Sequence, residues 1–426
     1  ILINLKYLEF EKFQNITKIK KRNNTNLSSL KKTFKKIILK LSHRKNKIAL
    51  LSLASSDQQK LMKIVGKENF IPFDLGLIEN LKDLNPECDT DFKFRFKNNK
   101  FKSRDHFKKL VYGNIFKHIP KEYLENYKFN NEIVGKFLSK DIKLAIIRVP
   151  TDLKTFNRFF LSKVSFLKGK ILSMQHGGSY GARDIFGVEN LEIKVSDKYL
   201  TWGWKSKNKK VHPFFVTKNN WIKKYNYNQD GNLLFVGASC KNFFYSFDEG
   251  QLPNHNNAYL KNSISFIKKL DKKNYKELIY RFYFQGNFNE HKYIKKIFPN
   301  IKISLREQNT YFYDLLYNSK LLITTNDATT HKEGFILNHP TIILLDYNFF
   351  NFRKEAKKYY QALYDAEILF NNPIKCAKKV NSISDNPQKW WQQKDVQRAK
   401  NFYNDYFCKI NNNYNNELAK IIKNMI

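Results

Sequence analysis

Short apolar runs alternate along the chain with longer segments that carry apolar residues on only one side. Runs at residues 142–149, 170–175 and 198–201 are continuous and short, which is typical of buried strands. Residues 152–166, between the first two runs, have helical periodicity. This strand–helix–strand order predicts a parallel sheet with helices on its faces.

A second series of the same kind follows residues 205–230, a segment rich in Lys, Asn and aromatic residues that we interpret as a linker. We expect strands at residues 232–237, 278–284, 301–305, 320–325 and 341–345. We expect helices at residues 256–270, 309–318, 354–366 and 394–424. The chain therefore predicts an α/β fold with two Rossmann-like units in series and C-terminal helices.

The N-terminal part predicts helices rather than strands. Residues 1–50 are basic and have a largely helical pattern, and residues 85–135 indicate helices joined by loops. Residues 27–41 place lysines on one side of a helix and apolar side chains on the other. Such a helix either lies on a membrane surface or packs on its own domain by the apolar stripe. The chain does not begin with Met, so we expect the first domain to lack part of its start.

The charge is extreme, with 77 basic and 38 acidic residues and a net charge of +39. Nucleic acid and an anionic membrane surface are the two partners that suit such a charge. Lysines are scattered and only 15 Gly and 10 Pro are present, so an AT-rich coding sequence explains the bias without a partner. No RRM, KH, zinc-finger or P-loop pattern supports nucleic acid, although 37 Phe and 24 Tyr provide rings that could stack on bases.

The four cysteines, Cys88, Cys240, Cys376 and Cys408, are far apart and include no C-x-x-C pair. This spacing indicates neither a zinc site nor a disulfide framework. It favours a reducing cytoplasm.

The stretch from Thr324 to Gly334 carries the first candidate site. An apolar strand is followed by Thr329 and Thr330 at a helix start, with Glu333 in the first turn. Free N–H groups and the dipole at a helix N-terminus favour a phosphate, and a carboxylate one turn on can accept from ribose hydroxyls. The alternative is structural: a Thr N-cap that forms a capping box with Glu333.

The second candidate site is a glycine turn headed by His176, at the carboxyl end of the strand at 170–175. Gly177 and Gly178 allow a sharp turn and close approach of a ligand. His176 can act as acid, base or phosphate partner. Tyr180 and Arg183 follow as candidate substrate contacts, unless they belong to an ordinary polar loop.

Other candidates lie at strand ends. Asp184 and Glu189 are carboxylates just downstream of the glycine turn. Gly237 and Ser239 follow the first strand of the second unit, where a second phosphate-facing turn would form. Arg281 on the next strand either reaches a phosphate or is a surface charge at a strand edge.

Three segments together resemble a known family: residues 175–181 (QHGGSYG), 196–204 (SDKYLTWGW) and 329–342 (TTHKEGFILNHPTI). They look like a bacterial family of surface-polysaccharide (O-antigen) transferases. That family is similar to GT-B glycosyltransferases, capsule Kdo transferases and polyglycerol-phosphate transferases. The resemblance covers about residues 140–350. It implies two Rossmann-like domains facing across a cleft: an acceptor domain at 1–220, a donor domain at 230–385, and a helical tail at 386–426.

The resemblance also implies roles for the candidate residues. Donor binding would fall to Gly237, Ser239, Arg281, Thr329, Thr330 and Glu333, with Glu333 on the ribose. Acceptor or substrate binding would fall to Gly177, Gly178, Tyr180 and Arg183, and catalysis to His176 and Asp184. His176 would be either the general base for the acceptor hydroxyl or a donor to the leaving phosphate. We expect no metal and no cofactor beyond the co-substrate, since helix dipoles and cationic side chains would stabilise the leaving diphosphate.

The expected function is transfer of a sugar from a nucleotide-sugar donor to a surface-polysaccharide acceptor, of lipopolysaccharide, O-antigen or capsule type. A polyol-phosphate or Kdo transferase of the same fold is the first alternative, and a non-enzymatic nucleic-acid-binding protein is the second. We expect a cytoplasmic protein that associates peripherally with the inner face of the cytoplasmic membrane. A glycan or lipid-linked glycan acceptor is the expected partner, and nucleic acid is not.

Overall fold

The computed structural model describes residues 47–51, 55–71, 88–97, 103–138, 140–148, 155–217, 225–238, 255–282, 289–305, 311–346 and 350–426. The chain divides into two compact units, Ile1–Ser173 with Asn415–Ile426, and Met174–Tyr414. The helix expected at residues 27–41 and the candidate residue Ser239 lie outside the described residues.

The first sheet has five strands in the order β1-β2-β3-β4-β5. They are β1 (Ile48–Leu51), β2 (Leu144–Ile147), β3 (Lys170–Met174), β4 (Lys198–Thr201) and β5 (Val211–Pro213). Pairing is parallel, with Ile48 opposite Leu144 and Leu144 opposite Lys170. The strands expected at 142–149, 170–175 and 198–201 are thus confirmed.

Two strands correct the sequence prediction. β1 lies at the end of residues 1–50, which were expected to be helical, and β5 lies inside the expected linker at 205–230. β1 offers only four apolar residues after a lysine-rich segment. β5 is three residues long with one buried apolar side chain. Neither carries enough periodic signal to be distinguished locally, so pairing with a neighbouring strand decides its conformation.

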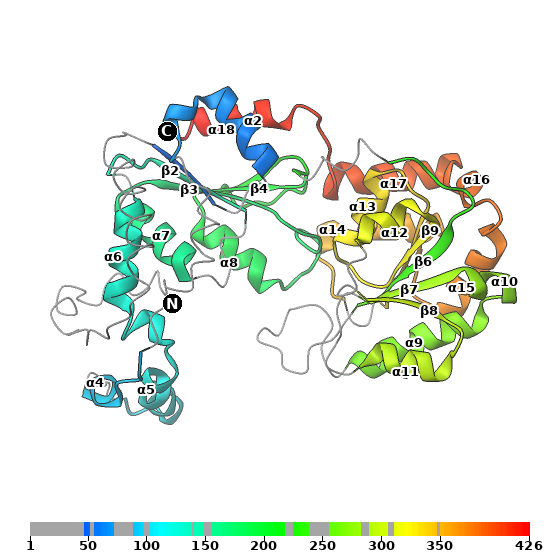
Figure 1. Cartoon of the computed structure of the whole chain (residues 1–426), viewed down its shortest axis with the longest axis horizontal. Coiled ribbons are helices and arrows are strands. Elements are labelled where there is room, and N and C mark those ends of the chain that lie inside the picture. Colours follow the sequence, from blue (N-terminus) through cyan, green and yellow to red (C-terminus); the bar gives the residue numbers. More distant parts are fainter. Residues whose placement is uncertain are drawn as a thin grey trace, which may run out of the picture. The chain divides into compact units, whose positions relative to one another are not determined.

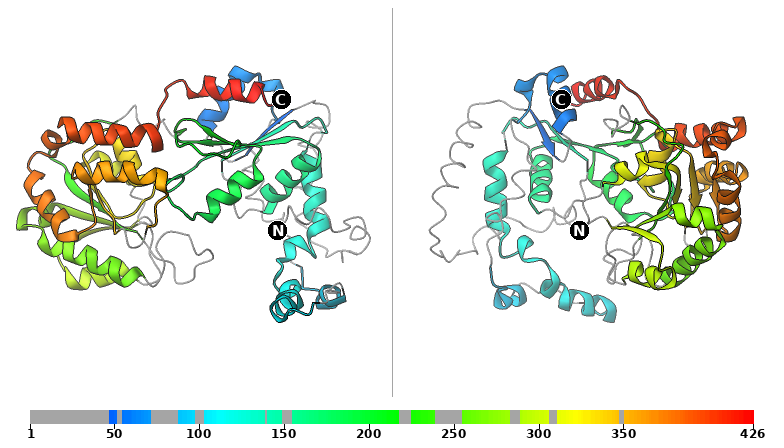
Figure 2. Two further views of the ribbon diagram at one scale, coloured as in Figure 1. Left: turned by 180° about the vertical axis from the view of Figure 1, so that it is seen from behind. Right: turned by 45° about the vertical axis from the view of Figure 1, so that its right-hand side comes forward.

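Helices cover both faces of the first unit's strands. α2 (Ser55–Val65) and α18 (Tyr414–Lys423) lie over one face in Figures 1 and 2, and α6 (Tyr127–Phe137) and α7 (Thr155–Phe166) over the other. Phe137 of α6 and Phe160 of α7 share a core with Ala145 and Ile171 of the sheet. α4 (Phe92–Lys97) and α5 (His106–His118) precede α6 along the chain, within the region expected to be helical.

The second sheet has six parallel strands in the order β11-β10-β9-β6-β7-β8. They are β6 (Asn232–Val236), β7 (Leu278–Phe282), β8 (Lys302–Leu305), β9 (Ser319–Thr324), β10 (Thr341–Leu344) and β11 (Leu369–Phe370). The order reverses between β6 and β9. Open α/β sheets bind ligands at the carboxyl ends of strands beside such a reversal. The predicted Rossmann-like unit is therefore confirmed.

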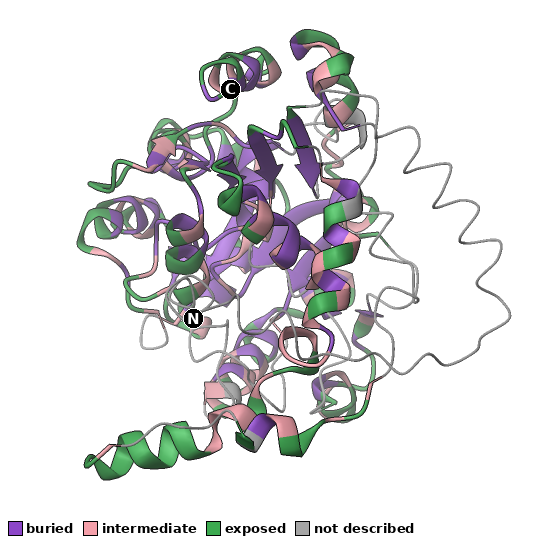
Figure 3. Ribbon diagram, turned by 90° about the vertical axis from the view of Figure 1, so that its left-hand side faces the viewer, coloured by how far each residue is buried: buried purple, intermediate pink, exposed green. Residues whose placement is uncertain are grey.

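Alternate residues of β6 face the two helical layers of this unit. Leu234 and Val236 share a core with Leu316 of α12 (Phe312–Tyr317). Phe235 points the other way and stacks on Phe266 of α9 (Asn256–Lys269), with ring centroids 4.9 Å apart. Most strand residues are buried, whereas the helices expose their outer sides (Figure 3). The α/β fold predicted from the sequence is thus confirmed for both sheets.

α8 (Gly187–Val195) lies beside β4 of the first sheet (Figure 1). The remaining helices flank the second sheet (Figure 1). They are α10 (Lys272–Glu277), α11 (Glu290–Ile297), α13 (Thr329–Ile336), α14 (Lys354–Asp365), α15 (Pro373–Ile383), α16 (Pro387–Trp391) and α17 (Lys394–Phe407). The expected helix at 394–424 is two helices, because α17 ends at Phe407 and α18 begins at Tyr414.

Candidate active site

The turn that carries His176 is held in place by the side chain of Gln175. Its Oε1 accepts from the backbone N–H of Trp202 at 2.9 Å and from the indole N–H of Trp204 at 2.8 Å. Its Nε2 donates to the carbonyl of Gly177 at 2.8 Å, and its backbone N–H donates to Leu200 at 2.8 Å. Gln175 is buried, so these bonds are shielded from water. The Gln175 amide thus links the segment at residues 175–181 to the segment at residues 196–204.

His176 lies at the surface end of a buried polar network. Its side chain is 30% exposed, and its Nδ1 lies 3.5 Å from a carboxylate oxygen of Glu192, which is fully buried. The Tyr180 hydroxyl lies 3.2 Å from Nδ1 of His176 and 3.3 Å from Nε2. The hydroxyl of Tyr199 donates to Glu192 at 2.9 Å. A buried carboxylate behind a half-exposed imidazole orients the ring and stabilises its protonated form.

Burial keeps both tyrosines of this network protonated. Burial, together with the charge of Glu192, raises the pKa of Tyr180. The same two causes raise the pKa of Tyr199 well above its ordinary value. The two tyrosines are therefore permanent hydroxyl groups in the network.

The glycine turn lies directly against the N-terminus of α13. The N–H of Gly178 donates to the Thr329 hydroxyl at 3.1 Å, and the Ser179 hydroxyl donates to the carbonyl of Asp327. A Cβ on Gly178 would lie 2.2 Å from the backbone of Ala328. Only glycine permits this approach. The two candidate segments of the sequence are therefore brought together in space.

The capping-box interpretation of α13 is wrong. The N-cap residue is Ala328, which provides no side-chain hydrogen bond. Thr329, the first helical residue, instead accepts from the glycine turn. Glu333 is 8% exposed and its Oε1 accepts from the Tyr313 hydroxyl at 3.0 Å. The N-cap residue of α13 thus provides no side-chain cap, and Glu333 lies beyond the first turn.

A buried charged cluster lies beneath the start of α13. Oδ1 of Asp327 accepts from the Tyr360 hydroxyl at 2.7 Å and from the Lys332 ammonium at 3.4 Å, and all three residues are buried. Burial alone would raise the pKa of Asp327, but Lys332 and Tyr360 hold it below its ordinary value. The Tyr403 hydroxyl lies 3.0 Å from Nε2 of His331. Burial, with the charge of Lys332, lowers the pKa of His331 to about 3.

Gly237 ends β6 at the point where the strand order reverses. A Cβ there would lie 2.7 Å from the ring of Tyr280 and 3.0 Å from the hydroxyl of Tyr259. The Tyr259 hydroxyl accepts from the N–H of Ala238 at 2.7 Å and bonds to the Thr325 hydroxyl at 2.9 Å. Tyr259 and Thr325 thus join the carboxyl ends of β6 and β9.

Arg281 is not a surface charge. It is only 6% exposed, and its Nη1 donates to the Ser304 hydroxyl of β8 at 3.1 Å. The surface-charge interpretation of Arg281 is therefore wrong. The parallel pairing of β7 and β8 places Arg281 directly opposite Ser304.

Arg183 and Asp184 lie where the turn meets the strand-like residues before α14. The guanidinium of Arg183 lies 4.8 Å from the ring centroid of Phe350. Asp184 is exposed, and its carboxylate accepts from the Asn351 amide at 3.3 Å. Asp184 thus contacts Asn351, whereas Glu192 contacts His176.

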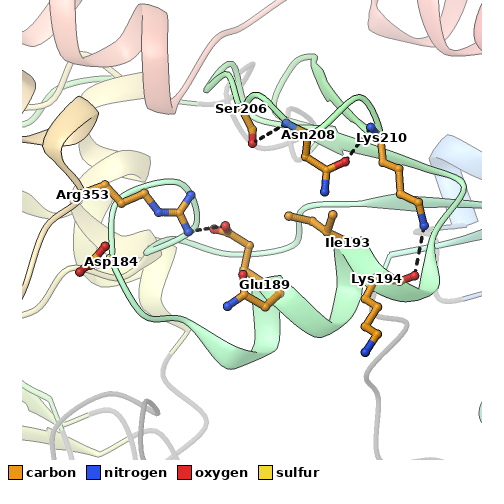
Figure 4. Close-up of a pocket in the computed structure, with 9 residues that line it drawn as sticks. Asp184, Glu189, Ile193, Lys194, Ser206, Asn208, Lys210 and Arg353 are labelled. Atoms are coloured by element: carbon orange, nitrogen blue, oxygen red, sulfur yellow. Dashed lines mark hydrogen bonds and ion pairs between the residues drawn. The ribbon is translucent and has the colours of Figure 1, made fainter. Parts of the chain in front are cut away.

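A cavity of about 480 Å³ lies beside this region (Figure 4). Asp184, Asn190 and Lys194 line it, and the ion pair of Glu189 with Arg353 forms part of its wall. Burial raises the pKa of Glu189, although Arg353 opposes that shift. His176 and Glu192 do not line this cavity.

Four residues of the site were missed by sequence reasoning: Gln175, Glu192, Tyr259 and Thr325. Gln175 and Thr325 lie inside the two segments that the sequence singled out, so their positions were a usable signal. Glu192 and Tyr259 lie on helices and meet the site only through packing, which no local pattern reports.

A membrane-spanning helix and a metal site are both absent from the described part of the chain. Within it, no helix is both apolar and long enough to cross a bilayer. Among the same residues, no three His, Cys, Asp or Glu side chains are grouped as a metal site would require.

Several solved structures are similar to the chain. Acinetobacter baumannii MurG is 9% identical, with 89% of this chain and 99% of that chain covered and a TM-score of 0.40. The wall teichoic acid polymerase TagF is 12% identical, with 68% and 74% covered and a TM-score of 0.39. WaaG, a glycosyltransferase involved in lipopolysaccharide biosynthesis, is 9% identical, with 88% and 99% covered and a TM-score of 0.35. No curated protein sequence matches the chain.

A family model matches almost the whole chain. It is the model of the LIC12162 family transferase, and it matches residues 2–422. The expected enzyme class, a transferase, is thereby confirmed, and the non-enzymatic nucleic-acid-binding alternative is wrong. The chain belongs to the LIC12162 family of transferases.

Proposed function

We propose that the protein is a glycosyltransferase that moves a sugar from a nucleotide-sugar donor to a surface-polysaccharide acceptor of lipopolysaccharide, O-antigen or capsule type. One observation carries the proposal: a half-exposed His176, backed by buried Glu192, stands on a turn that contacts the uncapped N-terminus of α13. A candidate base and a candidate phosphate site therefore adjoin each other, as transfer from a diphosphate donor requires.

The donor diphosphate would bind at the carboxyl ends of β6 and β9. Gly237 supplies close backbone approach there, and α13 supplies N–H groups with the positive end of its dipole. Thr329 accepts from Gly178, so its own hydroxyl proton remains available to a phosphate oxygen. Thr330 follows it in the first turn. Glu333, oriented by Tyr313, would accept from the ribose hydroxyls.

His176 would act as general base on the acceptor. With Nδ1 toward Glu192, its Nε2 takes the proton of the acceptor hydroxyl. The acceptor oxygen forms a bond to the anomeric carbon, and the bond from that carbon to the diphosphate oxygen breaks. The electron pair leaves with the nucleoside diphosphate. Glu192 stabilises the imidazolium that results.

We propose that the leaving diphosphate is stabilised by protein groups rather than by a resident metal. The dipole of α13 and the Thr hydroxyls supply that stabilisation. Turnover is then expected to persist after dialysis against EDTA, and loss of turnover that Mg²⁺ restores would contradict this part of the proposal.

A polyol-phosphate or Kdo transferase is the second candidate. The resemblance of the glycine-turn segments to families of both kinds favours it, and the same site residues would serve. Only the donor distinguishes these candidates, so the donor has to be identified by measurement.

The first experiment measures nucleotide binding by thermal shift and calorimetry. The panel is UDP, GDP, CDP, CMP, dTDP and their conjugates, with wild type, Glu333→Ala and Glu132→Ala. Glu132 is an exposed carboxylate on α6 and serves as the matched control. Saturable binding of one nucleotide that falls at least tenfold only in Glu333→Ala supports the donor site. CMP-Kdo or CDP-polyol selectivity favours the second candidate, and binding of no nucleotide contradicts both.

The second experiment tests the base with the donor so identified. His176→Asn and Glu192→Gln are expected to lower kcat by about 10²-fold or more, because general-base catalysis contributes on that order. Donor affinity should stay within twofold in both variants. Equal loss of donor affinity and kcat would mean that the network only supports the fold.

A further inference from the structure

Helices α4 and α5 present an exposed surface that is both apolar and basic. We call it the α4–α5 surface; it consists of Phe92, Lys93, Phe107, Lys108, Leu110, Val111 and Lys117. No residue of α5 is buried. Both helices lie at the edge of the first unit, beyond α6 (Figure 1). A 13-residue helix without a buried face is available for contact with a partner.

Three exposed apolar side chains of α5 fall on one side of the helix. Phe107, Leu110 and Val111 are 72%, 64% and 39% exposed. Their spacing of three and four residues places them next to each other on the helix surface. Phe92 of α4 adds another exposed ring, at 56%. Contiguous exposed apolar side chains of this kind mark interaction sites rather than ordinary surface.

The charges on the two helices that carry this stripe have one sign, whereas the exposed Asp89, Asp91 and Asp105 lie just before the helices. The α5 sequence HFKKLVYGNIFKH contains no Asp or Glu. Lys108 and Lys117 lie on opposite sides of the stripe, since successive residues turn by about 100°. Lys93 and Lys97 of α4 are also exposed. Asp105, the N-cap, is occupied with the backbone N–H of Lys108.

A buried arginine fixes the orientation of α5. Arg95 of α4 makes two 2.7 Å bonds to the Glu125 carboxylate. Its Nη1 donates to the carbonyls of Phe116 at 2.7 Å and Ile119 at 2.8 Å, at the C-terminus of α5. Arg95 is 2% exposed. The surface is therefore presented in a fixed direction, at no ordering cost on binding.

We propose that the α4–α5 surface docks on an anionic lipid bilayer. An apolar stripe flanked by lysines inserts at the headgroup boundary while the ammonium groups meet anionic headgroups. Phe92 and Phe107 could stack on bases, but Leu110 and Val111 have no ring, so the apolar component fits lipid better than nucleic acid. The inference rests on the proposed function only in that a membrane-borne acceptor gives docking a purpose.

The test is co-sedimentation of the full chain with neutral phosphatidylcholine vesicles and with vesicles containing 25% phosphatidylglycerol. Wild type should bind the anionic vesicles at least tenfold more tightly than the neutral ones. Phe107→Ser/Leu110→Ser should weaken binding to both kinds of vesicle at least tenfold, because it removes the apolar side chains that insert. Lys108→Gln/Lys117→Gln should weaken binding about 30-fold, at roughly 1 kcal/mol per cation near the membrane. Vesicle binding is measured without turnover, so the result can be interpreted even if the transferase assay fails.

Two matched variants separate the surface from general charge and hydrophobicity. Phe166→Ser/Leu167→Ser removes exposed apolar residues at and just after the end of α7, and Lys292→Gln/Lys296→Gln removes exposed charges of α11. Both should bind as wild type does. Equal loss in all variants, or no vesicle binding, overturns the proposal. A wild-type dimer that only the α5 variants dissociate would also overturn it. The same holds if the α5 variants lose binding to RNA but keep binding to vesicles. Circular dichroism checks that each variant is folded.

Discussion

At the scale of single residues, the absence of a Cβ at Gly178 allows the two segments of the candidate site to meet. Gly178 stands so close to Ala328 that any side chain would overlap the α13 backbone, whereas Gly177 has room. The neighbouring glycines thus have different roles. Gly178 permits contact between two segments, and Gly177 serves the turn itself.

Gly178→Ala is expected to separate the turn from α13 and to break the bond from its N–H to Thr329. Overpacking of this kind costs about 1–3 kcal/mol. Transferase activity should fall at least tenfold, because His176 moves with the turn. Steady-state rates and thermal unfolding measure the two effects.

Gly177→Ala is the control, since its Cβ would meet only the Thr329 hydroxyl, at 3.6 Å. Its thermal unfolding should match that of wild type, because the added Cβ overpacks nothing. If the two variants behave alike, contact with α13 is not what positions His176.

At the scale of elements, the loop after β3 is ordered by a side chain rather than by a helix or strand. Gln175 satisfies the N–H of Trp202 and the indole of Trp204, both of which are buried. Buried donors left without a partner cost about 1–3 kcal/mol each. The two family-like segments therefore stabilise each other through one amide.

Gln175→Met keeps the volume of the side chain but removes all its hydrogen bonds. We expect the free energy of unfolding to drop by about 2–4 kcal/mol, because two buried donors lose their acceptor. Urea denaturation followed by tryptophan fluorescence measures the change. Gln59→Met, at an exposed position of α2, should shift it by less than about 0.5 kcal/mol. A small effect in Gln175→Met would mean that water replaces the amide.

At the scale of the whole molecule, stability depends on pH through two buried histidines. Burial lowers the pKa of His339 to about 3, and burial with Lys332 does the same for His331. The unfolded chain protonates both near pH 6.5, whereas the folded protein does not. Acid therefore favours unfolding between pH 6.5 and about 3. Asp327, with its lowered pKa, adds to this only below about pH 4.

Lowering the pH from 7.5 to 5.5, which is one unit below the ordinary pKa of 6.5, should lower the free energy of unfolding by about 1.4 kcal/mol for each histidine. His339→Asn should remove about half of that loss, while losing its contacts with Tyr225 and Ser319 at both pH values. Urea midpoints at the two pH values test this. His118→Asn, an exposed histidine on α5, should leave the pH dependence unchanged.

The sequence by itself determined the parallel α/β character of the chain, most strand positions, and the two segments that meet at the site. These features are local, because an apolar run, a glycine turn and a helix start each leave a pattern within about ten residues. The roles expected for the candidate residues stay predictions.

Only the tertiary structure decided which side chains meet. Glu192 reaches His176 because it lies on the buried side of α8, and Asp184, which precedes α8, reaches Asn351 through the pairing of its backbone with that residue. Arg281 is buried because β8 pairs with β7, and Thr329 bonds to Gly178 instead of capping its helix. β1 and β5 are strands because a neighbour completes their hydrogen bonds. Each outcome depends on residues far apart in sequence, whose contact no local pattern records.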